Sequence, residues 1–473
     1  MMGMGRFLEL FKPISPFVPE VKPPERKVSF NSRLLWTGLA LIIYLIMSEI
    51  PLYGITITGV GDPMYTMRVI FASSRGTLME LGIGPIVTAG LIIQLLAGSG
   101  IIEVDFSNPD DRALFTTASK VFSLLMVLFQ ALLYIVSGAF GRVTFGVSIL
   151  LFGQLLAAGF IIMMLDELVQ KGWGIGSGIS LFIVAGITQR IWWNSFSLVP
   201  VGDGKRLGAV LAFFEAIFKR ESIWSWFHRS GNLPDMIGLL TTILVFAFII
   251  YIEGMRVELP VSHSMFRGYR GKMPLKLLYV SNIPVILAYA LFANVQMWSQ
   301  VIWQRWNQAN ANVWLNLIAT YNQTSQGPAP MGGLVYYITS PGSLDVVLRA
   351  PLRALIYACI VVAICVMFSK IWIEIGGMGP DKVADQLLSS GMQVPGFRRS
   401  RRPLMNLLNR YIPTITVIGG LLVGLIAAVS EFFGVFGSGM GALLCVSILY
   451  QYYQVLVQEQ VEEMYPFLRG ALR

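Results

Sequence analysis

The feature that most constrains this chain is a series of about ten apolar stretches, each long enough to cross a lipid bilayer. A membrane-spanning helix needs ~20 mostly apolar residues. Windows of this kind begin at Leu34, Ile83, Leu114, Val147, Gly176, Met236, Leu277, Leu352, Pro413 and Gly439. Hydrophobic residues make up 55% of the 473 positions and charged residues only 13%, whereas a soluble domain carries roughly 25% charged residues. We therefore predict an all-α integral membrane protein.

Lysine and arginine gather in three segments, and this distribution predicts the orientation in the membrane. They are frequent in residues 1–33, in the loop 254–276 and in the loop 370–412. Loops rich in lysine and arginine stay on the cytosolic side, and an even number of spans puts all three segments there. Both termini, including the tail 458–473, are therefore predicted to be cytosolic, and the loop 194–235 is predicted to be external.

A weak internal symmetry divides the spans into two groups of five. The second span of each half carries a proline among isoleucines, in Gly84-Pro85-Ile86-Val87 and in Ile283-Pro284-Val285-Ile286. The fifth span of each half begins with Gly-Ser-Gly, at 176–178 and at 437–439. An odd number of spans per half requires the halves to insert upside down relative to each other, and inverted repeats place the functional path at their interface. We predict two inverted five-helix halves around a central hydrophobic pore, residues 34–193 and 236–457.

The centres of the spans contain almost no ionisable residues. Acids such as Asp166 and Glu431 fall at or near span ends, and the two histidines, His228 and His263, lie in loops. A transporter coupled to protons or sodium normally places a carboxylate or histidine near the midplane, so a secondary transporter is the less favoured alternative. The sequence has no His-Glu-x-x-His, no G-x-S-x-G and no phosphate-binding loop. We predict no enzyme activity, no metal site and no cofactor.

Aliphatic side chains recur at helical spacing in the four spans that the repeat picks out. Ile83 and Val87 stand four residues apart, as do Ile179 and Ile183, so each pair shares a helix face. Ile286 and Leu444 occupy the matching spans of the second half. A ring of such side chains around a cavity blocks ions by dewetting, without any charged filter. The alternative is ordinary helix–helix packing, and the spacing alone favours that alternative.

Longer motifs give the chain a resemblance to one known family. They are Arg75-Gly76-Thr77-Leu78, Gly82-Ile83-Gly84-Pro85-Ile86-Val87-Thr88-Ala89-Gly90, Leu165-Asp166-Glu167-Leu168, Gly174-Ile175-Gly176-Ser177-Gly178-Ile179-Ser180-Leu181-Phe182-Ile183, Ser281-Asn282-Ile283-Pro284-Val285-Ile286 and Tyr411-Ile412-Pro413. These segments resemble the SecY/Sec61-alpha family, the channel subunit of the protein translocon, in its archaeal–eukaryotic branch. The similarity runs nearly end to end, in register with all the spans.

The resemblance implies roles for particular residues of the pore. It implies a pore ring made by Ile83, Val87, Ile179, Ile183, Ile286 and Leu444. It also implies a plug, a short helix that seals the external funnel, over residues 63–73. The plug side chains are Pro63, Met64, Tyr65, Met67, Val69, Ile70 and Phe71.

The same resemblance implies a lateral gate between spans two and three on one side and spans seven and eight on the other. Its polar residues would be Thr88, Gln130 and Asn282, which could equally be interhelical hydrogen-bonding residues of the kind common in membranes. Ribosome docking is implied for Arg267, Arg270 and Arg398 in the two basic loops. Those arginines also suit a role as topology determinants, and the two roles are compatible.

The function expected from the resemblance is a passive protein-conducting channel. It would pass unfolded secretory polypeptides across the membrane and release transmembrane segments sideways into lipid, driven by the ribosome or another motor. Expected partners are small subunits like SecE/Sec61-gamma and SecG/Sec61-beta, the ribosome, signal sequences and nascent polypeptides, and membrane lipid. The expected location is the archaeal cell membrane, with the endoplasmic reticulum membrane as the alternative.

Overall fold

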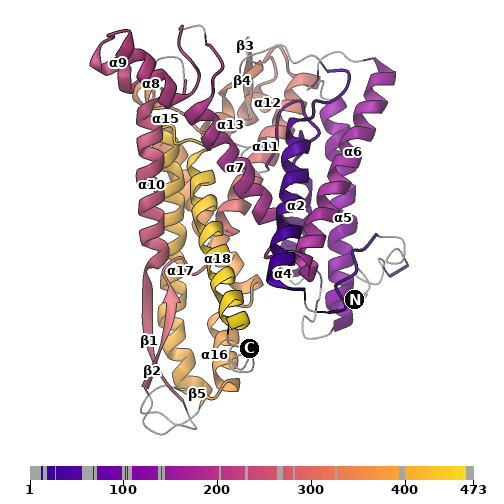
Figure 1. Cartoon of the computed structure of the whole chain (residues 1–473), viewed down its shortest axis with the longest axis vertical. Helices are drawn as coiled ribbons and strands as arrows, with labels where there is room; N and C mark the ends of the chain where they lie inside the picture. The colour runs from indigo at the N-terminus through magenta and orange to yellow at the C-terminus, as the bar shows by residue number, and fades with distance from the viewer. Residues whose placement is uncertain are drawn as a thin grey trace.

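The computed structural model describes residues 12–13, 19–26, 28–55, 68, 72–98, 102, 104, 109–136, 140, 144–201, 204–229, 233–263, 270–280, 283–324, 327–393 and 400–464. Ten long helices lie in these ranges, one for each predicted span (Figure 1). Those of the first half are α2 (Phe30–Glu49), α4 (Gly84–Gly98), α5 (Pro109–Val136), α6 (Phe145–Leu168) and α7 (Gly178–Phe196). Those of the second half are α10 (Met236–Gly254), α11 (Ile283–Trp306), α15 (Pro351–Ile375), α17 (Arg401–Phe432) and α18 (Gly439–Met464).

The helix starts differ from the predicted window starts, most of all in α11 and α17. α11 begins at Ile283 instead of Leu277, because Pro284 lacks an N–H and is best tolerated in the first turn of a helix. α17 begins at Arg401, well before Pro413, which lies inside the helix. Its early turns bury Leu404 and Leu408 in a separate hydrophobic cluster with the neighbouring helix α16 (Pro380–Ser389). Packing against α16 therefore accompanies the extension of α17 before its predicted span.

Eight of the described helices are long and apolar enough to cross a membrane. α4 and α7 are the two predicted spans outside this set, since α4 has only 15 residues and α7 contains Gln189 and Arg190. Short or polar helices are tolerated at membrane depth where protein or a water-filled cavity surrounds them. Both helices begin next to pore-ring residues, so their composition fits an internal position.

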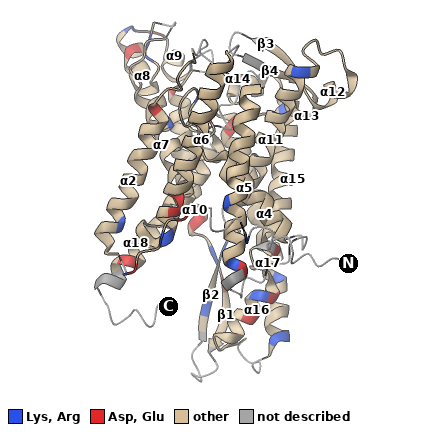
Figure 2. Cartoon of the chain, turned by 90° about the vertical axis from the view of Figure 1, so that its right-hand side faces the viewer, with Lys and Arg blue, Asp and Glu red and all other residues tan. Residues whose placement is uncertain are grey.

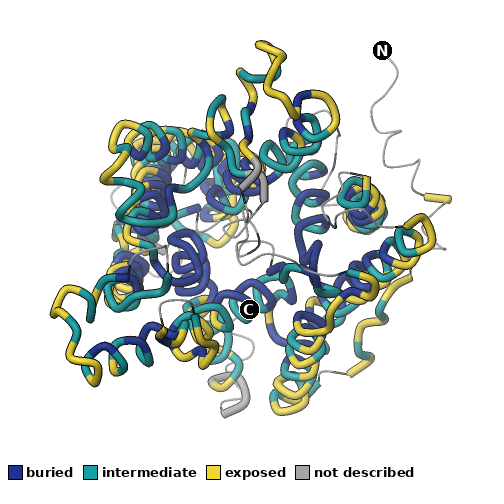
Figure 3. The backbone as a smooth tube through the Cα atoms, turned by 90° about the horizontal axis from the view of Figure 1, so that it is seen from above, coloured by how far each residue is buried: buried dark blue, intermediate teal, exposed yellow. Residues whose placement is uncertain are grey.

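The two halves pack their helices in the same way, which supports the inverted repeat. In each half the first helix packs on the fifth, the second on the third, the third on the fourth and the fourth on the fifth. Between the halves, α7 packs on α18, and α4 packs on both α11 and α15. Seen from above, buried residues occupy the inner sides of the helices and exposed residues the outside (Figure 3).

One end of the bundle carries a small antiparallel sheet, in the order β2 (Arg270–Lys276), β1 (Arg256–His263) and β5 (Met392–Gln393). β1 pairs with β2 over Arg256↔Lys276 to Ser262↔Arg270, and with β5 at Ser262↔Gln393. This sheet joins the two predicted cytosolic loops into one unit, and lysines and arginines lie on it and on α16 (Figure 2). The all-α prediction is right for the bundle and did not include these strands.

The opposite end carries smaller elements. They are α8 (Ala209–Phe218), α9 (Ile223–Phe227), α12 (Val313–Ile318), α13 (Gly333–Ile338), α14 (Leu344–Arg349) and the hairpin of β3 (Thr320–Thr324) and β4 (Gly327–Gly332). The first two belong to the predicted external loop 194–235. The hairpin and the other three helices belong to the segment that connects α11 to α15 (Figure 1).

Candidate functional site

All six predicted pore-ring residues lie in or against a single hydrophobic cluster at the centre of the bundle. Ile83, Ile183 and Leu444 are fully buried members of it. The other three, half-buried and packed against it, are Val87, Ile179 and Ile286. The six side chains come from the starts of α4, α7, α11 and α18, two helices from each half. The structure therefore brings together residues that the sequence separates by more than three hundred positions.

Each of the two Gly-Ser-Gly tripeptides ends at the first residue of a helix, and a buried acid caps that helix's first turn. In the first half Asp166 Oδ1 accepts a hydrogen bond from Ile179 N–H at 2.9 Å. In the second half Glu431 Oε1 accepts one from Gly439 N–H at 3.0 Å. The first N–H groups of a helix lack intrahelical partners and attract negative charge. These carboxylates therefore fix the residues at which α7 and α18 begin. The position of Ile179, Ile183 and Leu444 along the bundle is fixed as a result.

Glycine is required at the third position of each tripeptide because another helix approaches closely. A Cβ at Gly178 would lie 2.6 Å from Asp166 Cα, and a Cβ at Gly439 would lie 2.4 Å from Ser430 Cβ. The sequence showed Asp166 and Glu431 only as charges near span ends. A buried acid a few turns before a Gly-Ser-Gly start is the signal that would have indicated the caps.

The second oxygen of Glu431 extends the cap into a buried polar group near the predicted external end. Ser340 Oγ donates to Glu431 Oε2 at 2.7 Å. The hydroxyls of Tyr289 on α11 and Tyr357 on α15 lie 3.0 Å apart, and both side chains are buried. Tyr357 also packs on Phe432 of α17, with ring centroids 6.4 Å apart. Polar contacts and ring packing thus hold α11, α15 and α17 together beside the pore ring.

Most of the predicted plug lies outside the described residues, including Pro63, Met64, Tyr65, Met67, Val69, Ile70 and Phe71. Its C-terminal end is described and is firmly held. Arg68 Nη2 and Glu80 Oε1 form a buried ion pair at 2.7 Å, and Ser73 Oγ donates to Glu80 O at 2.5 Å. Glu80 Oε2 also accepts from Gly76 N–H.

Two helices of the first half contact the same segment. Arg190 Nη2 on α7 donates to Ser73 O at 2.5 Å, and Tyr44 OH on α2 donates to Ala72 O at 3.1 Å. Ala72 is itself a member of the cluster that contains the pore ring. The sequence interpretation did not single out Arg68, Glu80 and Arg190. Charged residues beside an apolar span are the signal that could have found them, because charge near a membrane interior is normally paired.

The predicted gate residues are described only in part. Thr88 on α4 and Gln130 on α5 are buried, and Thr88 Oγ1 has no hydrogen-bond partner among the described residues. Asn282 lies outside the described residues. A hydrogen-bonded cluster of the three therefore stays a prediction.

The predicted ribosome-binding arginines belong to the end of the bundle that carries the β2–β1–β5 sheet. Arg270 is the first residue of β2, while Arg267 and Arg398 lie outside the described residues. On the same end Arg401 Nε pairs with Asp385 Oδ1 at 2.8 Å on an exposed surface.

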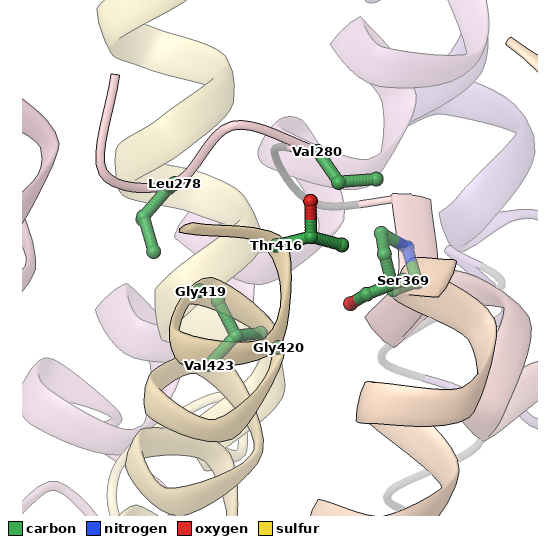
Figure 4. Close-up of a pocket in the computed structure, with 8 residues that line it drawn as sticks. Leu278, Val280, Ser369, Thr416, Gly419, Gly420 and Val423 are labelled. Atoms are coloured by element: carbon green, nitrogen blue, oxygen red, sulfur yellow. The ribbon is translucent and has the colours of Figure 1, made fainter. Parts of the chain in front are cut away.

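A small cavity of about 10 Å³ lies between the segment that precedes α11 and the helices α15 and α17 (Figure 4). It is lined by Leu278, Val280, Pro284, Ser369, Thr416, Gly419, Gly420 and Val423. A space of this size holds no more than about one water molecule. A Cβ at Gly420 would lie 2.5 Å from Ser369 Oγ, and one at Gly424 would lie 2.8 Å from Val362 Cα. The cavity is therefore not a ligand site, and the glycines of α17 at and beside it let α15 and α17 pack as one tight pair.

Residues 77–453 match the family model described as SecY, and residues 42–76 match the model described as the plug domain of Sec61p. The chain is 45% identical over 469 residues to the protein transport protein Sec61 subunit alpha of Dictyostelium discoideum, covering 97% of this chain and 98% of that protein. The chain belongs to the SecY family. Its predicted plug, residues 63–73, falls within the matched plug domain.

Two solved relatives share the fold of this SecY-family chain. One is described as a protein-conducting channel, with a TM-score of 0.80 and 37% identity over 96% of this chain and 98% of that one. The other is Sec61 in the canine ribosome–channel complex from the endoplasmic reticulum, with a TM-score of 0.78 and 36% identity over 96% of this chain and 98% of that one. The family consists of ten-helix protein-conducting channels and not of enzymes. The predicted family, fold class and channel function are therefore confirmed.

Proposed function

We propose that this chain forms the pore of a translocon through which unfolded polypeptides pass, with the ring of Ile83, Val87, Ile179, Ile183, Ile286 and Leu444 as the constriction. The observation that carries this proposal is that these six aliphatic side chains, from four helices and both halves, all belong to or pack against one hydrophobic cluster. A ring without charge excludes ions by dewetting and makes no specific contact with any one substrate side chain. That combination suits a channel whose substrates vary in sequence.

Transmembrane segments would leave sideways between α4 and α5 on one side and α11 and α15 on the other. Support comes from the packing. α4 packs on α5 and α11 packs on α15, and the two pairs meet where α4 contacts both α11 and α15. Thr88 and Gln130 lie on the first side of this seam, and Asn282 precedes the first turn of α11 on the second. Parting of the seam would open the pore to lipid without breaking either helix pair.

The driving force would come from a bound ribosome, or from another motor, since the sequence carries no phosphate-binding loop. The two basic loops, with Arg267, Arg270 and Arg398, meet in one sheet that projects from the bundle (Figure 1). Arginine binds phosphate through two hydrogen bonds, and ribosomal RNA presents phosphate throughout. The similar canine channel was solved in a ribosome–channel complex.

The proposed location is the endoplasmic reticulum membrane, with both termini in the cytosol. Similarity to the Dictyostelium and canine proteins favours this membrane over the archaeal cell membrane that the sequence motifs suggested first. Arg33 Nη1 pairs with Glu459 Oε1 at 2.5 Å, which places the start of α2 beside the end of α18. The proposed partners include small subunits like SecE/Sec61-gamma and SecG/Sec61-beta, by analogy with the family.

Site-specific photo-crosslinking tests the pore assignment directly. A photoreactive residue at Ile183 or Leu444 should crosslink to a stalled ribosome-bound nascent chain in reconstituted vesicles. The matched controls are Ile149 on α6 and Leu244 on α10, which are exposed on the outside of the bundle. Crosslinks of equal yield at ring and control positions, or none at the ring, would contradict the proposal. Solute uptake without any crosslink would instead favour the secondary transporter.

A further inference from the structure

An aromatic pair bridges the two halves at the seam between α5 and α11. The rings of Phe129 on α5 and Trp298 on α11 lie 5.3 Å apart between centroids, with an angle of 35° between their planes. The side chains are 40% and 42% exposed, so the pair lies at the outer rim of the seam and not in its interior. Both residues lie about two turns before the C-terminal ends of their helices, toward the predicted external side.

The surroundings of the pair place it where the proposed gate would open. Phe129 belongs to an exposed stripe with Leu125 and Leu132, whereas its neighbour Gln130 is buried. On α11, Leu291 and Trp298 are exposed on one face, seven residues apart. An opening that separates α5 from α11 therefore parts these two rings.

Packing between the two rings stabilises the closed seam relative to the open one, which simple burial of apolar surface does not do. Lipid tails are as apolar as leucine, so hydrophobic burial gives little preference for a closed seam over one that faces lipid. A tilted or stacked aromatic pair gains an additional stabilisation from its geometry. For this pair the gain corresponds to a closed-to-open equilibrium raised roughly 2- to 12-fold.

We propose that Phe129 and Trp298 form an aromatic latch, which sets how hydrophobic a signal sequence must be to open the gate. The latch rests on the proposed function, because it acts on the lateral gate assigned there. An incoming apolar helix that enters the seam replaces the ring–ring contact with contacts of its own. A weakly apolar helix compensates poorly for the lost ring–ring contact. The latch therefore discriminates among signal sequences by their hydrophobicity.

Leucine substitutions test the latch while they keep the rim apolar. In vesicles reconstituted with the complete channel complex, Phe129→Leu and Trp298→Leu should each raise insertion of a marginal signal sequence about fivefold. The double variant should do no more than either single one, because both changes remove the same ring–ring interaction. The measurement is insertion efficiency across a series of reporters with graded signal hydrophobicity.

The control pair is Trp192 and Phe196, which are exposed, lie 4.7 Å apart between centroids and belong to the single helix α7. Trp192→Leu and Phe196→Leu should leave the hydrophobicity threshold unchanged. Thermal denaturation in detergent identifies any variant that is misfolded, and Phe129→Tyr, which retains the ring, serves as a folded reference with a threshold near that of the wild type.

The outcomes separate the latch from the function on which it rests. An unchanged threshold in folded Phe129→Leu and Trp298→Leu channels, or strictly additive effects of the two changes, overturns the latch while wild-type translocation upholds the channel. An equal shift in the α7 control also overturns the latch. Failure of the wild-type complex to insert any signal sequence overturns both proposals.

Discussion

Arg68 and Glu80 form an ion pair of 2.7 Å whose side chains are only 9% and 3% exposed. One partner lies within the plug segment and the other lies just before the pore-ring residue Ile83. A buried pair is retained only where both charges are well partnered, and removal of one leaves the other uncompensated at a cost of about 3–5 kcal/mol. Removal of either partner should therefore disturb the link between the plug and the start of α4 far more than removal of one partner of an exposed pair.

We expect Glu80→Gln to release the plug. The idle channel in planar bilayers should then show frequent ion-conducting openings that the wild type lacks. Glu258→Gln is the control, because its partner Lys272 and Glu258 itself are exposed, and exposed pairs contribute ~0–1 kcal/mol. A silent bilayer from folded Glu80→Gln protein would show that the ion pair does not hold the plug.

Amides in the ring should make the idle pore leak. Ile83→Asn combined with Ile286→Asn places polar groups from both halves in the constriction, which wets it and gives a standing conductance. Ile149→Asn with Ile243→Asn, two exposed positions on α6 and α10, controls for general destabilisation. Lower expression without any leak would favour the alternative that the ring residues serve packing only.

Ribosome binding should depend on the predicted arginines through their charge. Replacement of Arg267, Arg270 and Arg398 by glutamine should weaken binding most at low salt. It should also flatten the dependence of log affinity on log salt by ~0.7–0.9 for each phosphate that an arginine no longer neutralises. Arg401→Gln is the matched control, since that arginine already pairs with Asp385. Affinities that match the wild type at every salt concentration would leave these residues as topology determinants.

Asn282→Ala should ease gate opening. Loss of one interhelical hydrogen bond in a membrane costs ~1 kcal/mol, which raises the open population about fivefold. Weak signal sequences should then be accepted more readily in an insertion assay. Asn409→Ala, an exposed position on α17, should have no such effect. Unaltered discrimination between strong and weak signals would argue against a gate role for Asn282.

The close approach at the start of α18 predicts a specific loss of stability. A methyl group at Gly439 meets Ser430 Cβ at 2.4 Å, so Gly439→Ala should lower the free energy of unfolding by about 1–3 kcal/mol. Gly153→Ala on α6 is the control, because no atom outside its own stretch of helix lies within 4 Å of its added Cβ. Thermal denaturation in detergent compares the two, and equal melting temperatures would contradict the packing described.

The helices could be predicted from the sequence because they depend on local patterns, whereas the pore ring stays a prediction that comes from the family resemblance and not from the aliphatic spacing. Apolar windows and glycine or proline at helix starts are visible in any short stretch. The contacts that set the starts of α7 and α18 were not predicted from helix patterns, since Asp166 and Glu431 cap helices other than their own and only their spacing before Gly-Ser-Gly hints at them. The sheet escaped prediction for a similar reason, because Ser262 in β1 meets Gln393 in β5 from 131 positions away.

The sheet also has a mechanical consequence. β2 ends at Lys276 and α11 begins at Ile283, while Leu277 N–H donates to Met255 O at the end of α10 at 3.0 Å. Only six residues separate β2 from α11, so a partner bound to the sheet would be coupled to the start of α11. Movement of the sheet would then be transmitted to the helix that carries Ile286 and Trp298.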